Sequence, residues 1–151
     1  MFYKKIMLAI DGSETSNSAL EEVIKIIKDQ DAQLKIVHVV DGASVYGGPG
    51  FDYASFLDVL REEGRVILSK AVQLIESQVP IKVEILLLEL RPMQGRVSEA
   101  IVEAAQTWQA DLLMIGTHGR KGFSRFFLGS VAEHVMRTAT MPVLLIRAPN
   151  P

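Results

Sequence analysis

The sequence predicts an α/β fold with a mostly parallel sheet, on the strength of two recurring patterns. Five short apolar runs occur along the chain with little alternation between apolar and polar residues, which is typical of strands buried on both faces. Between these runs lie segments with apolar residues at three- and four-residue steps, which is typical of amphipathic helices. Strands that alternate with helices, and a final strand, favour a parallel sheet covered by helices.

The expected elements follow in order along the chain. The expected strands are rich in Ile, Val, Leu and Met, and they cover residues 5–10, 34–40, 83–88, 112–115 and 143–146. The apolar faces of four helices are expected from Ala19, Val23, Ile26 and Ile27; from Val66, Leu68, Val72 and Ile75; from Ala100, Ile101, Ala104, Ala105 and Trp108; and from Val131, Val135 and Met136. Trp108 falls on an Ala-rich face, so we expect it to pack in the core rather than to offer a stacking platform. Because no internal repeat or linker-like composition appears, we interpret residues 1–151 as one domain.

Composition excludes several classes of function. Of the 151 residues, 48% are hydrophobic and 23% are charged, as in an ordinary globular domain. The formal net charge of −2 predicts no attraction for nucleic acid or an anionic membrane. The absence of cysteine excludes disulfides and Cys-ligated metals, and it agrees with a cytoplasmic location. The first apolar run ends at Asp11, too early for a secretory signal, and no run is long enough to span a bilayer.

The stretch 116–130, after the fourth expected strand, is the most informative part of the chain. It begins at Gly116 and ends with Gly129 and Ser130 at the start of a helix. Glycines let backbone N–H groups approach an anion, and a helix N-terminus adds a positive dipole, so the stretch suits a phosphate-bearing ligand. Its basic side chains belong to Arg120, Lys121 and Arg125. It matches neither the P-loop nor the dinucleotide fingerprint, and the alternative is that the glycines only form turns and the basic residues are solvated.

The chain resembles the universal stress protein family over essentially its whole length. The spacing Gly-x2-Gly-x9-Gly-Ser is similar to that family's nucleotide-binding signature and is formed by Gly116, Gly119, Gly129 and Ser130. The first strand and turn of the family resemble residues 6–14, and its closing helix and strand resemble residues 128–135 and 141–146. The resemblance implies an open five-stranded parallel sheet of order 3-2-1-4-5 with helices on both faces. This is the Rossmann-like fold of the adenine nucleotide alpha hydrolase type.

The resemblance also implies an adenine-nucleotide site, with ATP and Mg²⁺ or Mn²⁺ as its expected ligands. In this strand order the chain direction switches between the first and fourth strands, and open α/β sheets bind ligands at such a point. By resemblance, the main chain of Val39 contacts adenine, Ala9 and Ile10 wall the base, and Asp11 approaches the ribose or a metal-linked phosphate. The ribose and phosphates would be lined by Gly116, His118, Gly119, Gly129, Ser130 and Val131. Alternatively, Asp11 serves as an acid at a helix N-terminus, and both roles can coexist.

The three histidines do not form a metal-binding pattern. His38 lies within the second expected strand and is expected to be buried and hydrogen-bonded. His118 is a candidate phosphate contact, and His134 is expected to be a surface or packing residue. The family often has Gly-Asp/Asn-Pro at the start of its third helix, where this chain has Gly95, Arg96 and Val97, so the start of that helix stays open.

The function expected from the resemblance is that of an ATP-binding stress-response regulator or sensor. An enzyme for ATP hydrolysis or adenylyl transfer is one alternative, but Glu14 and His118 are the only candidate bases and form no recognisable catalytic set, so at most slow hydrolysis is expected. A nucleotide-free interaction module is the other alternative. A homodimer through the edge strand at residues 142–147 is expected in each case, unless Pro142 and the following tail blunt that edge. The sequence does not identify a protein partner or the inducing stress.

Overall fold

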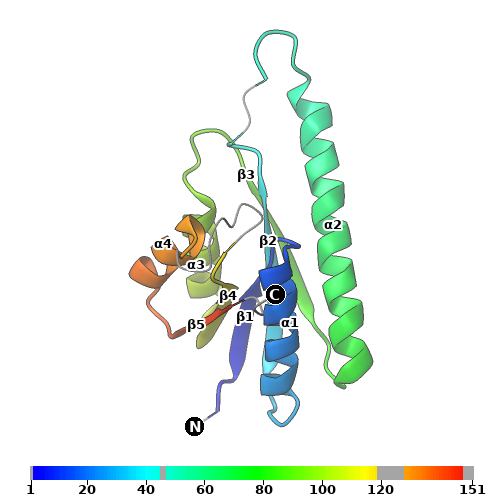
Figure 1. Cartoon of the computed structure of the whole chain (residues 1–151), viewed down its shortest axis with the longest axis vertical. Helices are drawn as coiled ribbons and strands as arrows, with labels where there is room; N and C mark the ends of the chain where they lie inside the picture. The colour runs from blue at the N-terminus through cyan, green and yellow to red at the C-terminus, as the bar shows by residue number, and fades with distance from the viewer. Residues whose placement is uncertain (1, 45–46, 119–127, 148–151) are drawn as a thin grey trace.

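The computed structural model describes residues 2–44, 47–118 and 128–147, and it contains a five-stranded sheet between two layers of helices (Figure 1). The strand order is β3-β2-β1-β4-β5, and every neighbouring pair is parallel. The elements in chain order are β1 (Lys5–Ala9), α1 (Glu14–Ile27), β2 (Gln33–Asp41), α2 (Tyr53–Gln78), β3 (Glu84–Leu90), α3 (Val97–Trp108), β4 (Leu112–Gly116), α4 (Ser130–Thr138) and β5 (Val143–Ile146). The predicted fold class and strand order are confirmed.

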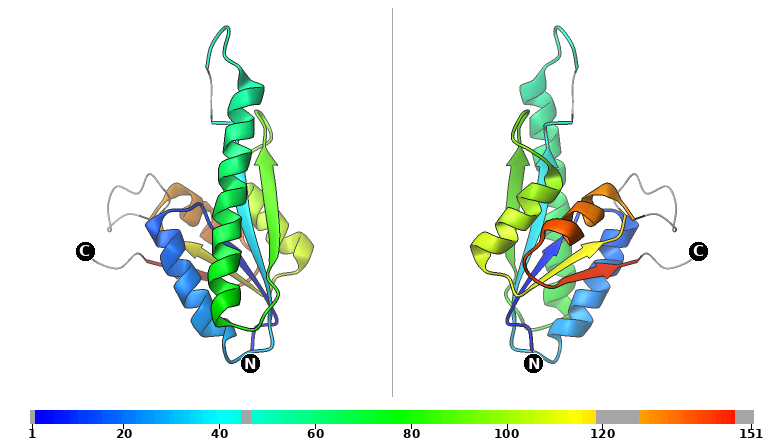
Figure 2. Two further views of the ribbon diagram at one scale, coloured as in Figure 1. Left: turned by 90° about the vertical axis from the view of Figure 1, so that its right-hand side faces the viewer. Right: turned by 90° about the vertical axis from the view of Figure 1, so that its left-hand side faces the viewer.

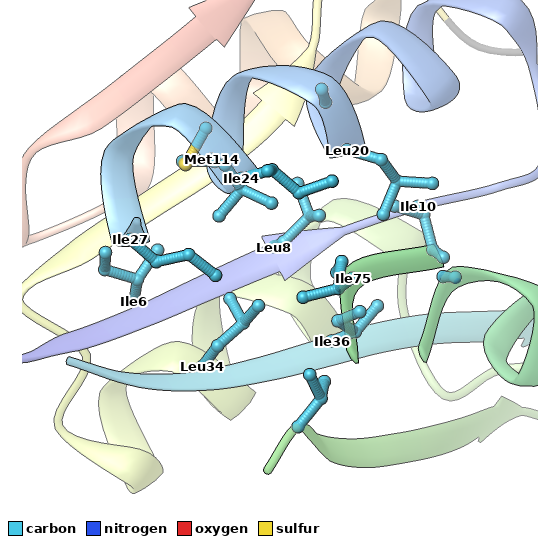
Figure 3. Close-up of a cluster of buried hydrophobic side chains, with 14 of the residues drawn as sticks. Ile6, Leu8, Ile10, Leu20, Ile24, Ile27, Leu34, Ile36, Ile75 and Met114 are labelled. Atoms are coloured by element: carbon cyan, nitrogen blue, oxygen red, sulfur yellow. The ribbon is translucent and has the colours of Figure 1, made fainter. Parts of the chain in front are cut away.

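The helices are divided between the two faces of the sheet (Figure 2), with α1 and α2 on one side and α3 and α4 on the other. Side chains of β1 alternate between these layers although the whole strand is apolar. Ile6 and Leu8 enter the cluster under α1 and α2 (Figure 3), whereas Met7 and Ala9 enter the cluster under α3 and α4. Because β1 is buried on both faces, it is the centre of the fold.

Two residues that the apolar spacing places on buried helix faces are exposed. Val66 on α2 is 42% exposed and Met136 on α4 is 51% exposed. The buried side of α2 passes through Leu68 and Ile75, and Val66 precedes Leu68 by about half a helical turn, so it lies on the opposite side. Within the described parts of the chain, no helix is long and apolar enough to cross a bilayer.

Trp108 packs against the core as expected, but at its edge. Its side chain is partly buried against the cluster under α3 and α4. The Nζ atoms of Lys5 and Lys35 each lie 4.9 Å from the centroid of its ring, and Lys5 Nζ also donates to the Trp108 carbonyl at 2.8 Å. The ring therefore meets two ammonium groups at the start of β1 and β2 as well as apolar side chains.

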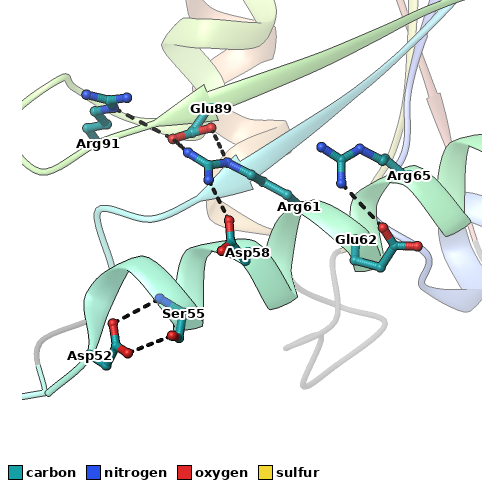
Figure 4. A network of polar contacts seen from close by, with 8 residues as sticks. All are labelled: Asp52, Ser55, Asp58, Arg61, Glu62, Arg65, Glu89 and Arg91. Carbon is teal, nitrogen blue, oxygen red and sulfur yellow. Dashed lines mark hydrogen bonds and ion pairs between the residues drawn. The ribbon is translucent and has the colours of Figure 1, made fainter.

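An ion-pair network ties α2 to the edge strand β3 (Figure 4). Arg61 donates to both carboxylate oxygens of Glu89, at 2.8 and 2.7 Å, and to Asp58 at 2.8 Å. Arg91 pairs with the same Glu89 carboxylate at 3.6 Å. The hydrogen bonds from Arg61 lower the pKa of Glu89 below its ordinary value of 4.5. These bonds hold the N-terminal half of α2 beside the carboxyl ends of the strands.

Candidate functional site

The predicted site residues come together in one cavity at the carboxyl ends of β1, β2 and β4. The cavity has a volume of about 590 Å³, which suits a ligand of nucleotide size. The predicted residues that line it are Ala9, Ile10, Asp11, Val39, Gly116, His118, Gly129, Ser130 and Val131. Gly119 and the basic residues of the same loop lie outside the described residues. The cavity lies at the switch point between β1 and β4, where the strand order predicts a ligand.

Asp11 is held by the first turn of α1 while it lines the cavity. Its Oδ1 accepts the Ser13 N–H at 2.9 Å, and its own N–H donates to Ser16 Oγ at 2.9 Å. Ser13 caps α1 by accepting the Ser16 N–H at 3.2 Å, and Gly12, with a φ of 83°, provides the left-handed residue of the turn. Asp11 therefore does act as an acid at the N-terminus of α1, and it lines the cavity at the same time.

A metal ion at Asp11 would depend on the ligand. Among the described residues, no group of three or more His, Cys, Asp or Glu side chains is placed to hold an ion. A Mg²⁺ or Mn²⁺ ion beside Asp11 would therefore take most of its ligands from nucleotide phosphates and water, as Mg²⁺ usually does.

Val39 turns its main-chain groups toward the cavity. The Ile10 N–H donates to the Val37 carbonyl at 3.0 Å, and this is where the pairing of β1 with β2 ends. Hydrogen-bonding directions alternate along a strand, so Val39, two residues further on, points its N–H and its carbonyl to the same side, where β1 no longer runs. Within the described part of the chain, neither group has a backbone partner on that side. A donor and an acceptor are thus available next to each other.

The N-terminus of α4 forms another wall. Its N-cap residue, Gly129, donates to the Thr117 carbonyl at 2.7 Å and supplies no side-chain cap. The first bond back to Gly129 comes from the Glu133 N–H at 2.9 Å. The N–H groups of the first turn, which includes Ser130 and Val131, are therefore at a helix end that attracts anions.

Gly116 has a role in close contact between elements as well as a place in the cavity. A Cβ atom at this position would lie 2.5 Å from Cγ2 of Thr15 on α1. Real Cβ atoms essentially never approach that closely. The glycine therefore lets the end of β4 pass next to the first turn of α1, a reason that is independent of any ligand.

The sequence did not indicate one wall of the cavity, which comes from α2 and from β2. Phe56, Leu60 and Glu63 of α2 line it, as does His38 of β2. His38 is buried, with 9% exposed, and its Nδ1 lies 2.8 Å from the Ile10 carbonyl oxygen, which confirms the prediction of a buried, hydrogen-bonded histidine. The apolar spacing at Phe56 and Leu60 was the available signal, but it indicates only one side of a helix.

A second cavity of about 490 Å³ adjoins the first and shares Ser130 and Val131 with it. Arg96 lines this second cavity and is the N-cap of α3, without a side-chain cap bond, which settles where the third helix starts. His134 lines it from α4 and is partly buried, in agreement with a packing role. Of the residues that the structure describes, none forms a hydrogen bond with its Nδ1.

The fold and the cavity define a class: an α/β protein with a ligand-sized site at the switch point of a 3-2-1-4-5 sheet. The family model of the universal stress protein family matches residues 2–147, and the chain belongs to that family. The universal stress protein MJ0531 of Methanocaldococcus jannaschii is 36% identical over 149 residues, which cover 98% of this chain and 84% of the relative.

Solved structures agree with this assignment. The crystal structure of a universal stress protein family member from Burkholderia pseudomallei is 33% identical, with a TM-score of 0.78 and coverage of 95% of this chain and 96% of that one. The universal stress protein from Archaeoglobus fulgidus in complex with dAMP is 25% identical, with a TM-score of 0.65 and coverage of 97% and 99%. At least one structural relative therefore binds an adenine nucleotide.

Proposed function

We propose that this protein binds an adenine nucleotide, ATP foremost, in the switch-point cavity and acts as a stress-response regulator or sensor. The observation that carries the proposal is the main chain of Val39, whose N–H and carbonyl face a cavity of about 590 Å³ without a strand beside them. The edge of adenine carries a ring-nitrogen acceptor next to an amino donor, so it complements that pair. The complex of the related Archaeoglobus fulgidus protein with dAMP supports the same ligand class.

The phosphates fit the other end of the cavity. Ser130 and Val131 bring the first turn of α4, and the helix dipole favours negative charge there. Asp11 also lines the cavity and would meet the ribose or a metal ion bound to phosphate. The polarity of the cavity thus suits a base at β2 and phosphates at α4.

The arrangement supports binding rather than rapid turnover. Of the two candidate bases, His118 lines the cavity, and its Nδ1 lies 3.0 Å from Thr117 Oγ1, whereas Glu14 is exposed on α1 and does not line the cavity.

The absence of cysteine noted above makes the cytoplasm the proposed compartment.

Calorimetry with ATP, with and without Mg²⁺, tests the binding site in wild-type protein and in a matched pair of variants. Ser130→Asp places a negative charge against the phosphates, and Ser130→Asn has nearly the same shape without the charge. We expect micromolar binding by the wild type and a loss of at least about tenfold in Ser130→Asp, since about 1.4 kcal/mol of repulsion is enough. Ser130→Asn should stay close to the wild type.

The stability of the Asp variant serves as its control. An acid in the first turn of a helix is favourable for folding, so Ser130→Asp should unfold no more easily than the wild type while it loses affinity. An absence of heat from the wild type up to millimolar ATP would instead favour a nucleotide-free interaction module.

We also propose a homodimer through the edge strand at residues 142–147. Among the residues that the structure describes, β5 pairs only with β4, and Leu144 in its centre is 36% exposed. A short apolar edge of this kind favours pairing with a second copy. Light scattering should give twice the chain mass for the wild type and for Met136→Lys, which changes an exposed residue of α4, and the chain mass for Leu144→Lys. A monomeric wild type would overturn the proposal.

A further inference from the structure

The pairing of β1 with β2 ends where a side chain bonds to the next acceptor. If the parallel ladder continued past Ile10, the Val39 N–H would donate to the Ile10 carbonyl. Instead, Nδ1 of His38 lies 2.8 Å from that oxygen. A carbonyl oxygen can only accept, so Nδ1 carries the proton. In the described part of the chain, no backbone N–H donates to this carbonyl.

The His38 ring is fixed by α2 on its other side. Gly64 lies in the middle of α2, and a Cβ there would come within 2.9 Å of His38 Cδ2 and 2.8 Å of Leu87 Cδ1. Glycine destabilises a helix interior relative to alanine, so this position gives up helix stability and leaves space for the ring. The Ile10 carbonyl and α2 thus contact the His38 ring from two sides.

We infer that His38 is a positioning residue for base recognition, and this inference rests on the proposed function for the identity of its ligand. By occupying the Ile10 carbonyl, His38 keeps the Val39 N–H out of the ladder and directed into the cavity. That N–H donates to N1 of adenine, while the Val39 carbonyl accepts from the 6-amino group. Hypoxanthine carries the reverse pattern, with a proton on N1 and an oxygen at position 6, so the same pair rejects it.

A first experiment needs no nucleotide. Asn and Leu have nearly the same shape, but only Asn can donate to the Ile10 carbonyl, so His38→Asn and His38→Leu form a matched pair. Amide hydrogen exchange at Val39, followed by NMR, should be fast in the wild type and in His38→Asn. In His38→Leu we expect exchange about tenfold slower or more, because the Val39 N–H then bonds to the vacant carbonyl. Protection of Val39 in the wild type, or no added protection in His38→Leu, would overturn the inference.

A second experiment compares the dissociation constants of ATP and ITP. The wild type and His38→Asn should prefer ATP by about tenfold or more. With ITP, the Val39 N–H would face another donor and the Val39 carbonyl another acceptor. His38→Leu should bind the two nucleotides almost equally. Gly64→Ala, which pushes the ring while it keeps the histidine, should lower the preference in the same direction.

The outcomes separate the two proposals. If the wild type binds neither nucleotide, the proposed function fails, while the exchange of Val39 still decides the role of His38. If the wild type prefers ATP and both His38→Leu and Gly64→Ala retain that preference, the positioning role fails and nucleotide binding stands. A purely structural role of His38 would weaken ATP and ITP alike and leave their ratio unchanged.

Discussion

Replacing Gly116 with alanine measures how closely α1 approaches the end of β4. The new Cβ would lie 2.5 Å from Thr15 Cγ2, 3.1 Å from Thr15 Cβ and 3.3 Å from its backbone carbonyl carbon. Thr15 is 6% exposed in the first turn of α1, and its branched side chain has few rotamers, so it cannot turn aside. Overpacking of this kind costs about 1–3 kcal/mol, and we expect about 2 kcal/mol here.

The free energy of unfolding, from urea titration followed by circular dichroism, gives this loss directly. For a chain of this length, 2 kcal/mol corresponds to a fall in Tm of roughly 4–8 °C. The matched variant is Thr15→Ser, which removes Cγ2 and by itself should cost about 1 kcal/mol for a buried methyl group. In the double variant the closest contact is gone, so the losses should add to less than their sum by about 1 kcal/mol. Strictly additive losses would refute the contact with Thr15 as the cause.

Three further predictions concern stability. The side chain of Leu8, on β1, is fully buried under α1 (Figure 3). Leu8→Ala should therefore lower the free energy of unfolding by about 2–5 kcal/mol in urea titration. Arg61 lowers the pKa of Glu89 in the folded state. The ionised Glu89 therefore stabilises the fold above its ordinary pKa of 4.5, and this stabilisation is lost as the pH falls through the folded-state pKa. The stability difference between wild type and Glu89→Gln should therefore be largest near neutral pH and shrink in titrations near pH 3; a constant difference would show that the charge is not responsible. Ser13→Ala removes the cap that accepts the Ser16 N–H and should cost about 0.5–2 kcal/mol by thermal unfolding, whereas Ser18→Ala on the same helix should change little.

The fold class could be predicted because the strands contain short apolar runs, whereas the strand order followed from the family resemblance. The run at residues 143–146 matches β5 to the residue, and the first run extends one residue beyond β1. Such runs are bounded by residues that break a strand, so their ends are visible in the sequence. The length of α2 was not visible, because its N-terminal half carries exposed apolar residues such as Val59 and its buried side is narrow.

The parts of the site that lie at the ends of strands were predictable. The parts that depend on how a helix crosses the sheet were not. Asp11 and Val39 follow from the strand order that the family resemblance implies, since carboxyl ends of parallel strands meet at one edge. The contact of His38 with Gly64 depends on how α2 crosses β2, and no local pattern records that crossing. Trp108 was placed at the core correctly, but its neighbour Lys35 comes from a distant strand, so the ring's contact with ammonium groups could not be foreseen.

The central place of β1 has a consequence for the order in which the protein is made. Ile6 pairs with Leu34 on one side and with Leu112 on the other, so the second pairing closes a loop through most of the chain. Closing so long a loop is slow, and it cannot begin on the ribosome until β4 has emerged. A nascent chain that ends before β4 therefore lacks part of the switch point. Ligand binding can stabilise the fold only after β4 has been synthesised. The nucleotide binding that we propose would therefore require that β4 has been synthesised and has paired with β1.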